Sequence, residues 1–203
     1  MLDWKIEETY FNEQTRILCG CDEAGRGPLA GPVYAAAVVL PRSFSLEGLN
    51  DSKKLTALQR DRLFDRICAE ADDWCVARAE VEEIEEINIL NAALLAMRRA
   101  VEGLKVLPDL ALVDGNVSRG FPIPAVAVVH GDALSPSIAA ASILAKVSRD
   151  RYCEEMDKRY PEYGFAKHKG YGTKAHYAAL DAYGPCPEHR MSFLRTYFER
   201  NGS

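Results

Sequence analysis

Short apolar runs along the chain alternate with longer stretches in which apolar residues recur at helical spacing. An apolar run of about four to eight residues that stops at glycine, proline or aspartate is typical of a buried strand. The pattern predicts five strands, over residues 16–21, 33–40, 74–79, 110–113 and 125–129.

The longer stretches predict helices. Leu63 and Ile67 lie four positions apart on one side of such a stretch, and Thr56 is a suitable N-cap for it. Ser135 is a second candidate N-cap, with Pro136 at the first helical position, which proline favours. The predicted helices cover residues 56–71, 81–104, 135–159, 173–182 and 192–199.

The order of these elements predicts the fold class. The first two strands are joined by the short glycine- and proline-rich piece 22–32, so they are most simply antiparallel. The later strands alternate with helices, which favours parallel pairing and helices on the faces of the sheet. We therefore expect an α/β fold with a central mixed β-sheet flanked by helices. A chain of 203 residues is expected to form a single domain, residues 1–203.

Charge is distributed unevenly along the chain. The formal net charge is -5, yet residues 72–86 carry seven acids and one arginine, while residues 164–178 carry three lysines, two histidines and no acid. A protein with one basic, aromatic face can bind a polyanion in spite of a negative sum. The alternative is that these lysines are simply solvated.

No apolar window is long enough to cross a membrane, and the acidic N-terminus lacks the apolar core of a secretory signal. We expect no membrane partner and a cytoplasmic location. Reduced thiols are expected there, and the cysteines form no C-x-x-C pair. A metal role for Cys19 and Cys21, which share one face of a strand, is the alternative. The cysteines are Cys19, Cys21, Cys68, Cys75, Cys153 and Cys186.

Acids follow three of the predicted strands: Asp22 and Glu23, then Asp114, then Asp132. Ends of neighbouring strands meet at a crevice, and carboxylates gathered there repel one another unless a cation neutralises them. Oxygen ligands select hard ions, so the sequence predicts Mg²⁺ or Mn²⁺. Two ions about 4 Å apart can align a water and a leaving oxygen across a phosphate. Taken alone, Asp114 could be only a turn residue, and Asp132 could only begin a helix.

Gly25, Arg26 and Gly27 follow the first acids directly. Glycine lets the backbone approach a ligand closely, and the arginine between two glycines can reach a phosphate. Metal ligands and a phosphate contact together indicate phosphodiester chemistry. A tight turn with a surface arginine is the alternative.

These motifs resemble a known family. The segments DEAGRGPLAG (22–31), LNDSKKL (49–55), LVDGN (112–116), GDALSPSIAAASILAKVSRD (131–150), HKGYGT (168–173) and HRMSF (189–193) occur in order over nearly the whole chain. They resemble the type 2 ribonucleases H, the bacterial ribonuclease HII family. The resemblance implies the ribonuclease H-like fold, with a helical segment at about 160–203 that carries the basic residues and closes over the substrate.

The resemblance also implies roles for single residues. The four acids would bind the metal ions and activate a water, and Gly25, Arg26 and Gly27 would hold the 2′-hydroxyl that distinguishes RNA from DNA. Tyr171 would pack against the deoxyribose that follows a ribonucleotide; a core tyrosine is the alternative. Lys53 would contact a phosphate. Weaker phosphate candidates are Lys167, Lys169, Lys174 and Arg151.

The sequence departs from the family pattern around Asp132. Relatives often carry cations two residues before and two residues after this aspartate, where His130 and Leu134 stand here. The departure puts a local phosphate contact in doubt and leaves the metal site intact. His189 is expected to be structural, and His168 and His176 are expected to be hydrogen-bonded or solvent-facing.

The resemblance implies a metal-dependent endonuclease, a ribonuclease H, that cuts the RNA strand of RNA/DNA hybrids. It would also incise ribonucleotide-containing duplex DNA on the 5′ side of a single ribonucleotide, leaving 3′-hydroxyl and 5′-phosphate ends. Ribonucleotide excision repair and RNA primer removal would follow, and we expect a monomer. The rival interpretations are a DNA nuclease or recombinase on the same fold, and a non-catalytic nucleic-acid binding module.

Overall fold

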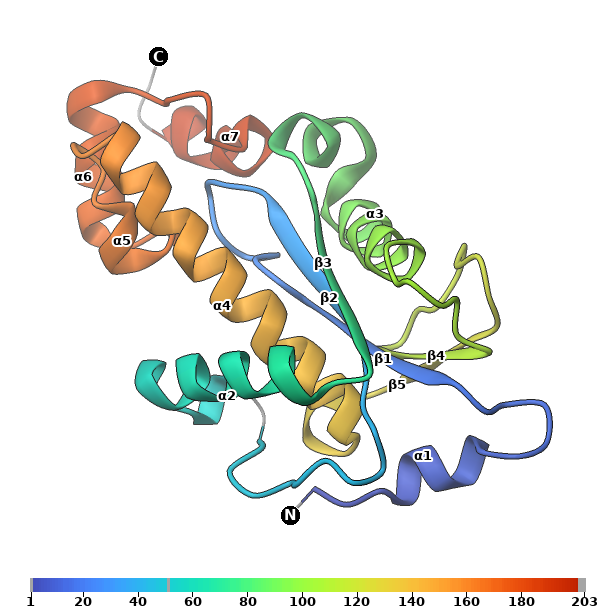
Figure 1. Ribbon diagram of the computed structural model, residues 1–203. Coiled ribbons are helices and arrows are strands. Elements are labelled where there is room, and N and C mark those ends of the chain that lie inside the picture. Colours follow the sequence, from blue (N-terminus) through green and yellow to red (C-terminus); the bar gives the residue numbers. More distant parts are fainter. Residues whose placement is uncertain (1, 51, 201–203) are drawn as a thin grey trace.

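A mixed β-sheet forms the centre of the computed structural model, which describes residues 2–50 and 52–200 (Figure 1). Within these residues the sheet has five strands in the order β3-β2-β1-β4-β5. Neighbours β1–β2 and β2–β3 are antiparallel, and β1–β4 and β4–β5 are parallel, which confirms the predicted mixed sheet. The strands are β1 (Leu18–Ala24), β2 (Val33–Val39), β3 (Asp73–Ala79), β4 (Leu110–Asp114) and β5 (Ala125–Val128).

Helices cover both faces of the sheet, as predicted: α3 lies on one face, and α4 with α2 lies on the other (Figure 1). The shorter α5, α6 and α7 gather near the C-terminal end of α4. The helices are α1 (Lys5–Tyr10), α2 (Ala57–Glu70), α3 (Val81–Glu102), α4 (Pro136–Arg159), α5 (Phe165–His168), α6 (Lys174–Tyr183) and α7 (Met191–Arg200), with 3₁₀ turns η1 (Ser52–Lys54) and η2 (Gly131–Ala133).

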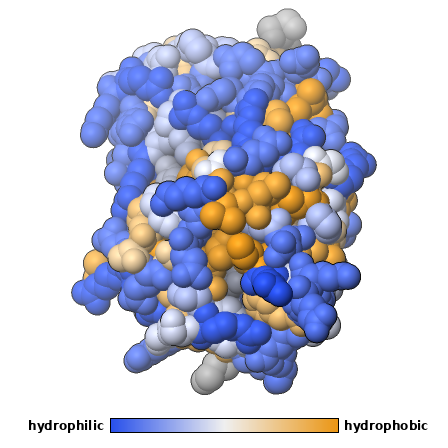
Figure 2. All heavy atoms as spheres, turned by 45° about the vertical axis from the view of Figure 1, so that its right-hand side comes forward, coloured by the Kyte–Doolittle hydropathy of each residue, from blue (hydrophilic) through white to orange (hydrophobic). Residues whose placement is uncertain are grey.

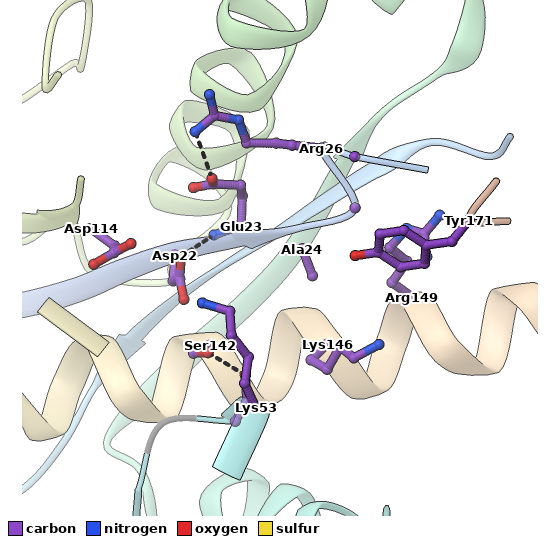
Figure 3. Close-up of a pocket in the computed structure, with 13 residues that line it drawn as sticks. Asp22, Glu23, Ala24, Arg26, Lys53, Asp114, Ser142, Lys146, Arg149 and Tyr171 are labelled. Atoms are coloured by element: carbon purple, nitrogen blue, oxygen red, sulfur yellow. Dashed lines mark hydrogen bonds and ion pairs between the residues drawn. The ribbon is translucent and has the colours of Figure 1, made fainter. Parts of the chain in front are cut away.

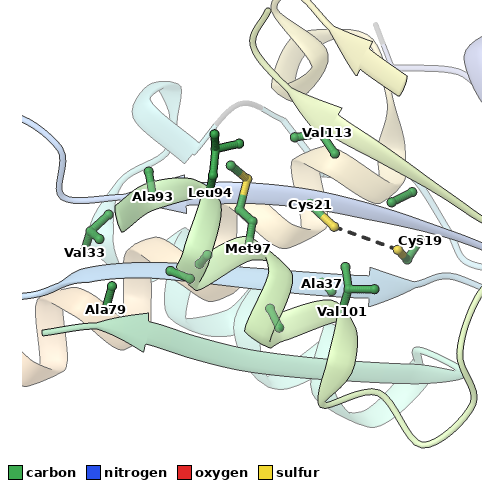
Figure 4. Close-up of a cluster of buried hydrophobic side chains, with 14 of the residues drawn as sticks. Cys19, Cys21, Val33, Ala37, Ala79, Ala93, Leu94, Met97, Val101 and Val113 are labelled. Carbon is green, nitrogen blue, oxygen red and sulfur yellow. Dashed lines mark hydrogen bonds between the residues drawn. The ribbon is translucent and has the colours of Figure 1, made fainter. Parts of the chain in front are cut away.

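Alternation along the strands divides the core into two layers. Odd-numbered side chains such as Cys21 and Ala37 pack against Met97 and Val101 of α3 (Figure 4), because successive strand residues point to opposite faces. On the other face, Gly20 lies directly under the start of α4. A Cβ atom at Gly20 would lie 2.1 Å from the carbonyl carbon of Ser137. This close approach holds the start of α4 against the amino-terminal half of β1.

The first turn of α4 is fixed by two caps. Ser135 accepts a hydrogen bond from the amide of Ile138, as the sequence predicts. The second cap was not predicted: Glu7 of α1 is buried and accepts from the Ser135 hydroxyl (2.6 Å) and the Ser137 amide (3.1 Å). An acid at a helix N-terminus is favoured by the helix dipole. The short α1 escaped prediction because it is too short for helical spacing to be visible.

The stretch predicted as one helix over 81–104 is broken at Asn88. Its backbone angles, φ 67° and ψ 164°, are not helical, so α3 consists of two helices joined at this residue. The Asn88 side chain accepts from the amides of Leu90 and Asn91 and therefore caps the second helix. The apolar spacing continues across the break, which is why the sequence did not reveal it.

The six cysteines are free thiols, and the Sγ atoms of Cys19 and Cys21 lie 3.8 Å apart in the core. The face shown in Figure 2 is mostly hydrophilic, with apolar side chains gathered near its centre. Some exposed apolar side chains are normal on the surface of a folded protein. Among the described residues, no helix combines the length and apolar character needed to cross a membrane.

Candidate active site

The carboxylates that the sequence singles out converge at one edge of the sheet. Asp22 and Glu23 are among the last residues of β1, and parallel pairing of Cys21 with Val113 places Asp22 beside Asp114 at the end of β4. Asp132 is not at a strand end as expected, because β5 stops at Val128 and the aspartate lies in the following turn η2. Its backbone amide nevertheless donates to Asp114 Oδ1 at 3.3 Å.

The electrostatics of this edge are those of crowded carboxylates. Asp22 is 5% exposed, and burial, together with the charges of Glu23 and Asp114, raises its pKa well above the ordinary value. Burial also raises the pKa of Glu23, although Arg26 opposes the shift. The pKa of Asp114 is raised by burial and by Asp132. Three ionised carboxylates this close together repel one another until a cation neutralises their charge.

Two cationic side chains contact these acids. Arg26 Nη1 lies 3.2 Å from Glu23 Oε1 (Figure 3). Lys53 Nζ lies 3.2 Å from Asp132 Oδ2. Across residues 2–50 and 52–200, no three acidic, histidine or cysteine side chains are arranged to hold a metal ion. Two of the four carboxylates are therefore occupied by protein cations. The donor set itself consists of oxygen atoms, which suits Mg²⁺ or Mn²⁺.

A cavity of about 290 Å³ opens beside the acids (Figure 3). It brings together most of the residues that the sequence predicted. Asp132 is not part of the lining but contacts two residues that are, Asp114 and Lys53. The predicted residues in its lining are Asp22, Glu23, Gly25, Arg26, Gly27, Lys53, Asp114 and Tyr171.

Four polar residues of the lining were missed by sequence reasoning. Ser52 and Ser142 share a hydrogen bond of 2.7 Å, and Lys146 pairs with Asp150 at 2.6 Å. Arg149, the fourth, is buried. The signal that could have found three of them is helical periodicity, since Ser142, Lys146 and Arg149 recur on one face of α4. The sequence predicts that stretch only as a helix on a face of the sheet.

The loop after β1 needs its first glycine for two reasons. Gly25 has φ +103°, and a Cβ atom there would lie 2.1 Å from Arg149 Nε. At Gly27, a Cβ atom would touch the Tyr171 ring at 3.4 Å. The loop is therefore packed between Arg149 and Tyr171, and its backbone forms part of the cavity wall.

Tyr171 is 47% exposed, which excludes the core alternative. Tyr171 lies in the turn that follows α5. This turn is bound to the loop that follows β1, because the Leu29 amide donates to the Gly170 carbonyl at 2.8 Å. Gly170 has φ +80°, and a Cβ atom there would lie 2.7 Å from the Ala30 oxygen. The tyrosine thus projects beside the cavity from a fixed backbone.

A chain of hydrogen bonds beneath Tyr171 fixes two histidine tautomers. His176 Nδ1 lies 3.0 Å from the Tyr171 carbonyl, which can only accept, so Nδ1 carries the proton. In the neutral ring Nε2 must accept, and its partner is His189 Nε2 at 3.0 Å. His189 Nδ1 then accepts from the Cys186 amide at 2.9 Å, and in this tautomer it has no proton for the Cys186 carbonyl at 3.2 Å. His189 therefore supports the turn that carries Tyr171 and is not among the residues that line the cavity.

Both histidines are kept neutral by their surroundings. Burial, together with the neighbouring His168 and His189, lowers the pKa of His176 to about 4. Burial also lowers the pKa of His189. His130 and Leu134 are exposed, so Leu134 places no cation two residues after Asp132, and only a histidine stands two residues before it.

The weaker phosphate candidates fall into two groups. Lys169 pairs with Glu154 at 3.3 Å, and Arg151 pairs with Asp61 at 3.4 Å. The remaining candidates, Lys167 and Lys174, are exposed. The exposed lysines are therefore better placed to meet a phosphate than the paired side chains.

The sheet is mixed and flanked by helices, carboxylates lie at the ends of β1 and β4, and a glycine loop lies beside them. This combination is that of a nuclease with the ribonuclease H-like fold. A family model described as Ribonuclease HII matches residues 19–200. The chain belongs to the ribonuclease HII family and is a ribonuclease H.

Relatives and solved structures agree with this assignment. The chain is 60% identical to a ribonuclease HII of Albidiferax ferrireducens over 177 residues, 87% of this chain and 86% of the relative. It is 54% identical to that of Caldicellulosiruptor bescii over 192 residues, 95% and 93% of the two chains. The ribonuclease H2 of Pyrococcus horikoshii OT3 has a similar structure, with a TM-score of 0.73 and 29% identity over 91% of this chain and 98% of that one. Bst-RNase HIII in complex with Mn²⁺ shares the fold, with a TM-score of 0.65 and 17% identity over 91% of this chain and 71% of that one.

Proposed function

We propose that this protein hydrolyses the RNA strand of RNA/DNA hybrids and incises duplex DNA on the 5′ side of a single embedded ribonucleotide, leaving 3′-hydroxyl and 5′-phosphate ends. The observation that carries the proposal is the meeting of Asp22, Glu23 and Asp114 with the loop 25–27 and Tyr171 in one cavity. In the cell this activity would serve ribonucleotide excision repair and RNA primer removal in the cytoplasm. The enzyme would act as a monomer with one domain, residues 1–203, in which residues from about 160 bind substrate.

Asp22, Glu23, Asp114 and Asp132 are the proposed ligands of Mg²⁺ or Mn²⁺. The oxygen donors and the raised pKa values of three of the acids support a cation at this edge, and a structural neighbour binds Mn²⁺. When bound, two such ions supply the positive charge that activates water and stabilises the leaving oxygen. The carboxylates position that charge and need not react themselves.

Arg26 and Lys53 are the proposed phosphate contacts. Their side chains are 50% and 78% exposed, so they can turn from the carboxylates toward a phosphate without disturbing the core. Each would then exchange a carboxylate for a phosphate oxygen, and the vacated carboxylate would become a metal ligand. The substrate and the metal ions would thus be bound together.

The loop 25–27 and Tyr171 are the proposed readers of the sugar. Backbone groups of a glycine loop can hydrogen-bond a 2′-hydroxyl at short range, because no side chain stands in the way. The Tyr171 ring, 3.4 Å from the Cβ position at Gly27, is near enough to pack on the next sugar of the same strand. A deoxyribose would pack there better than a ribose, whose 2′-hydroxyl would crowd the ring, so a ribonucleotide followed by DNA would be cut faster than an all-RNA strand.

The test is metal-dependent cleavage of a labelled duplex with one ribonucleotide, beside an all-DNA duplex and an RNA/DNA hybrid. Cleavage of the ribonucleotide duplex and the hybrid, but not of the all-DNA duplex, supports the proposal. Cleavage of DNA alone supports a DNA nuclease or recombinase, and tight binding without cleavage supports a binding module.

Asp22→Asn should abolish cleavage and keep or strengthen substrate binding, because it removes a ligand charge and also repulsion with the phosphates. The matched control is Asp65→Asn on the exposed face of α2, which should cleave normally. Cleavage by Asp22→Asn within a few-fold of wild type in Mg²⁺ would overturn the ligand assignment.

A further inference from the structure

Arg190 is a fully buried arginine whose side chain donates to backbone carbonyls of the loop after β1 and lies over the Phe193 ring, 5.2 Å from the ring centroid. Its Nη2 donates to the carbonyls of Gly25 and Gly31, each at 2.7 Å. Its Nη1 donates to Arg26 at 3.0 Å and to Pro28 at 2.9 Å, and Nε donates to Gly31 at 2.9 Å. One side chain therefore gathers four carbonyls of the loop around itself.

Only a guanidinium can make this set of contacts. Arginine carries five N–H donors on three nitrogens in a planar fork, whereas the three donors of lysine radiate from one nitrogen. Burial and the nearby Arg149 lower the pKa of Arg190 to about 9, so it remains charged at neutral pH. Burying a charge without an acidic partner is costly, and the carbonyl oxygens are what offsets the cost.

The contacts of Arg190 determine where the loop amides point. The described peptide bonds are trans, and in a planar trans peptide the C=O and N–H point in opposite directions. The Gly25 and Arg26 carbonyls turn toward Arg190, so the amides of Arg26 and Gly27 turn away from it. Both residues line the cavity, and no acceptor for either amide occurs among the described residues.

We propose that Arg190 is a positioning residue that sets the substrate preference of the enzyme: it holds the loop so that the amides of Arg26 and Gly27 face the cavity as donors for the 2′-hydroxyl oxygen of a ribonucleotide. The inference rests on the proposed function of this loop and extends it to a side chain that never touches the substrate. Arg149, packed against Gly25 and donating to the Ala30 carbonyl at 3.1 Å, supports the same loop from the α4 side.

The test compares binding of two duplexes, one with a single ribonucleotide and one of DNA alone, in an Asp22→Asn background that prevents cleavage. Arg190→Lys keeps the charge but loses most of the carbonyl contacts, so it should lower the preference for the ribonucleotide about tenfold, the scale of one or two lost hydrogen bonds. Binding of the DNA duplex should stay within about twofold, because contacts to DNA phosphates are unchanged. The control is Arg99→Lys on α3, which also donates to a carbonyl, that of Arg78, but lies outside the cavity.

The outcomes separate the inference from the function on which it rests. If the Asp22→Asn protein itself shows no preference for the ribonucleotide duplex, the proposed reading function fails. If that preference exists and Arg190→Lys keeps it, or loses affinity for both duplexes equally, the positioning role fails. Where Arg190→Lys does not unfold cooperatively, Arg190→Gln is measured in the same way. Loss of cooperative unfolding in both variants would make Arg190 a residue of the fold and overturn the proposal.

Discussion

The hydrogen-bonded pair His176–His189 makes the stability of the protein depend on pH in a direction that can be worked out. His176 is 0% exposed, and its pKa is lowered from 6.5 to about 4 in the folded protein. As the pH falls below 6.5 the unfolded chain binds a proton before the folded protein does. The stabilisation is therefore fully present above about pH 6.5 and is lost as the pH falls toward 4.

The magnitude follows from the size of the shift. Each pKa unit corresponds to about 1.4 kcal/mol of unfolding free energy. The loss of stability through His176 therefore cannot exceed about 3 kcal/mol, and about 2 kcal/mol should already be lost at pH 5. Other groups titrate in this range too, so the prediction concerns the difference between wild type and His176→Asn. Asparagine does not titrate but can still donate to the Tyr171 carbonyl.

The assay is urea unfolding of both proteins between pH 7.5 and 5. At pH 7.5 His176→Asn should be less stable by about 2 kcal/mol, because the ring is lost from its contacts with Phe165 and from its 4.4 Å stack on His168. This gap should shrink by about 2 kcal/mol at pH 5. A gap for His176→Asn that does not change with pH would refute the neutral pair.

Three further predictions concern the substrate and the core. In single-turnover cleavage, Tyr171→Ala should slow incision of a DNA–ribonucleotide–DNA strand about ten- to a hundredfold, and it should slow cleavage of an all-RNA strand in a hybrid less. Tyr171→Phe should have a milder effect on both substrates. Equal losses on both substrates would show that Tyr171 does not select the junction. Substrate binding should weaken as salt is added, and Lys167→Gln should flatten the slope of log binding constant against log salt concentration by about 0.9. Lys169→Gln should change this slope less, because Lys169 is paired with Glu154. Identical slopes for wild type and Lys167→Gln would mean that this lysine is only solvated. In urea unfolding, Gly20→Ala should cost more than about 3 kcal/mol because its Cβ meets the α4 backbone, whereas Gly115→Ala, with φ +99° and open space around it, should cost only about 1–2 kcal/mol of strain; similar costs would contradict the close packing of β1 and α4.

The sequence predicted most of the sheet, because its strands contain apolar runs that give way to acids, at Asp22 within β1 and at Asp114 at the end of β4. The caps of α2 and α4 at Thr56 and Ser135 were also predicted and are confirmed, since capping depends on residues only three positions apart. Features decided by neighbours in sequence were therefore within reach of pattern reasoning.

What the sequence did not reveal depends on contacts between distant parts of the chain. Glu7 resembles any exposed acid until α1 is seen to deliver it to the start of α4. Arg149 and Arg190 resemble surface arginines, because buried arginines are rare and nothing local marks them. At Asn88 the apolar spacing continues through the break, so only the backbone angles show it.

The span of chain between Arg190 and its carbonyl partners has a consequence for the order in which the protein matures. The hydrogen bonds close a separation of 159 to 165 residues, whereas the acids of β1 and β4 meet through a strand pairing that is complete by residue 114. During synthesis from the N-terminus, the carboxylates can therefore assemble well before residue 190 leaves the ribosome. The loop 25–27, the proposed reader of the sugar, acquires its support only after Arg190 has been synthesised. A product terminated before residue 190 would thus carry an acidic edge without the support of that loop.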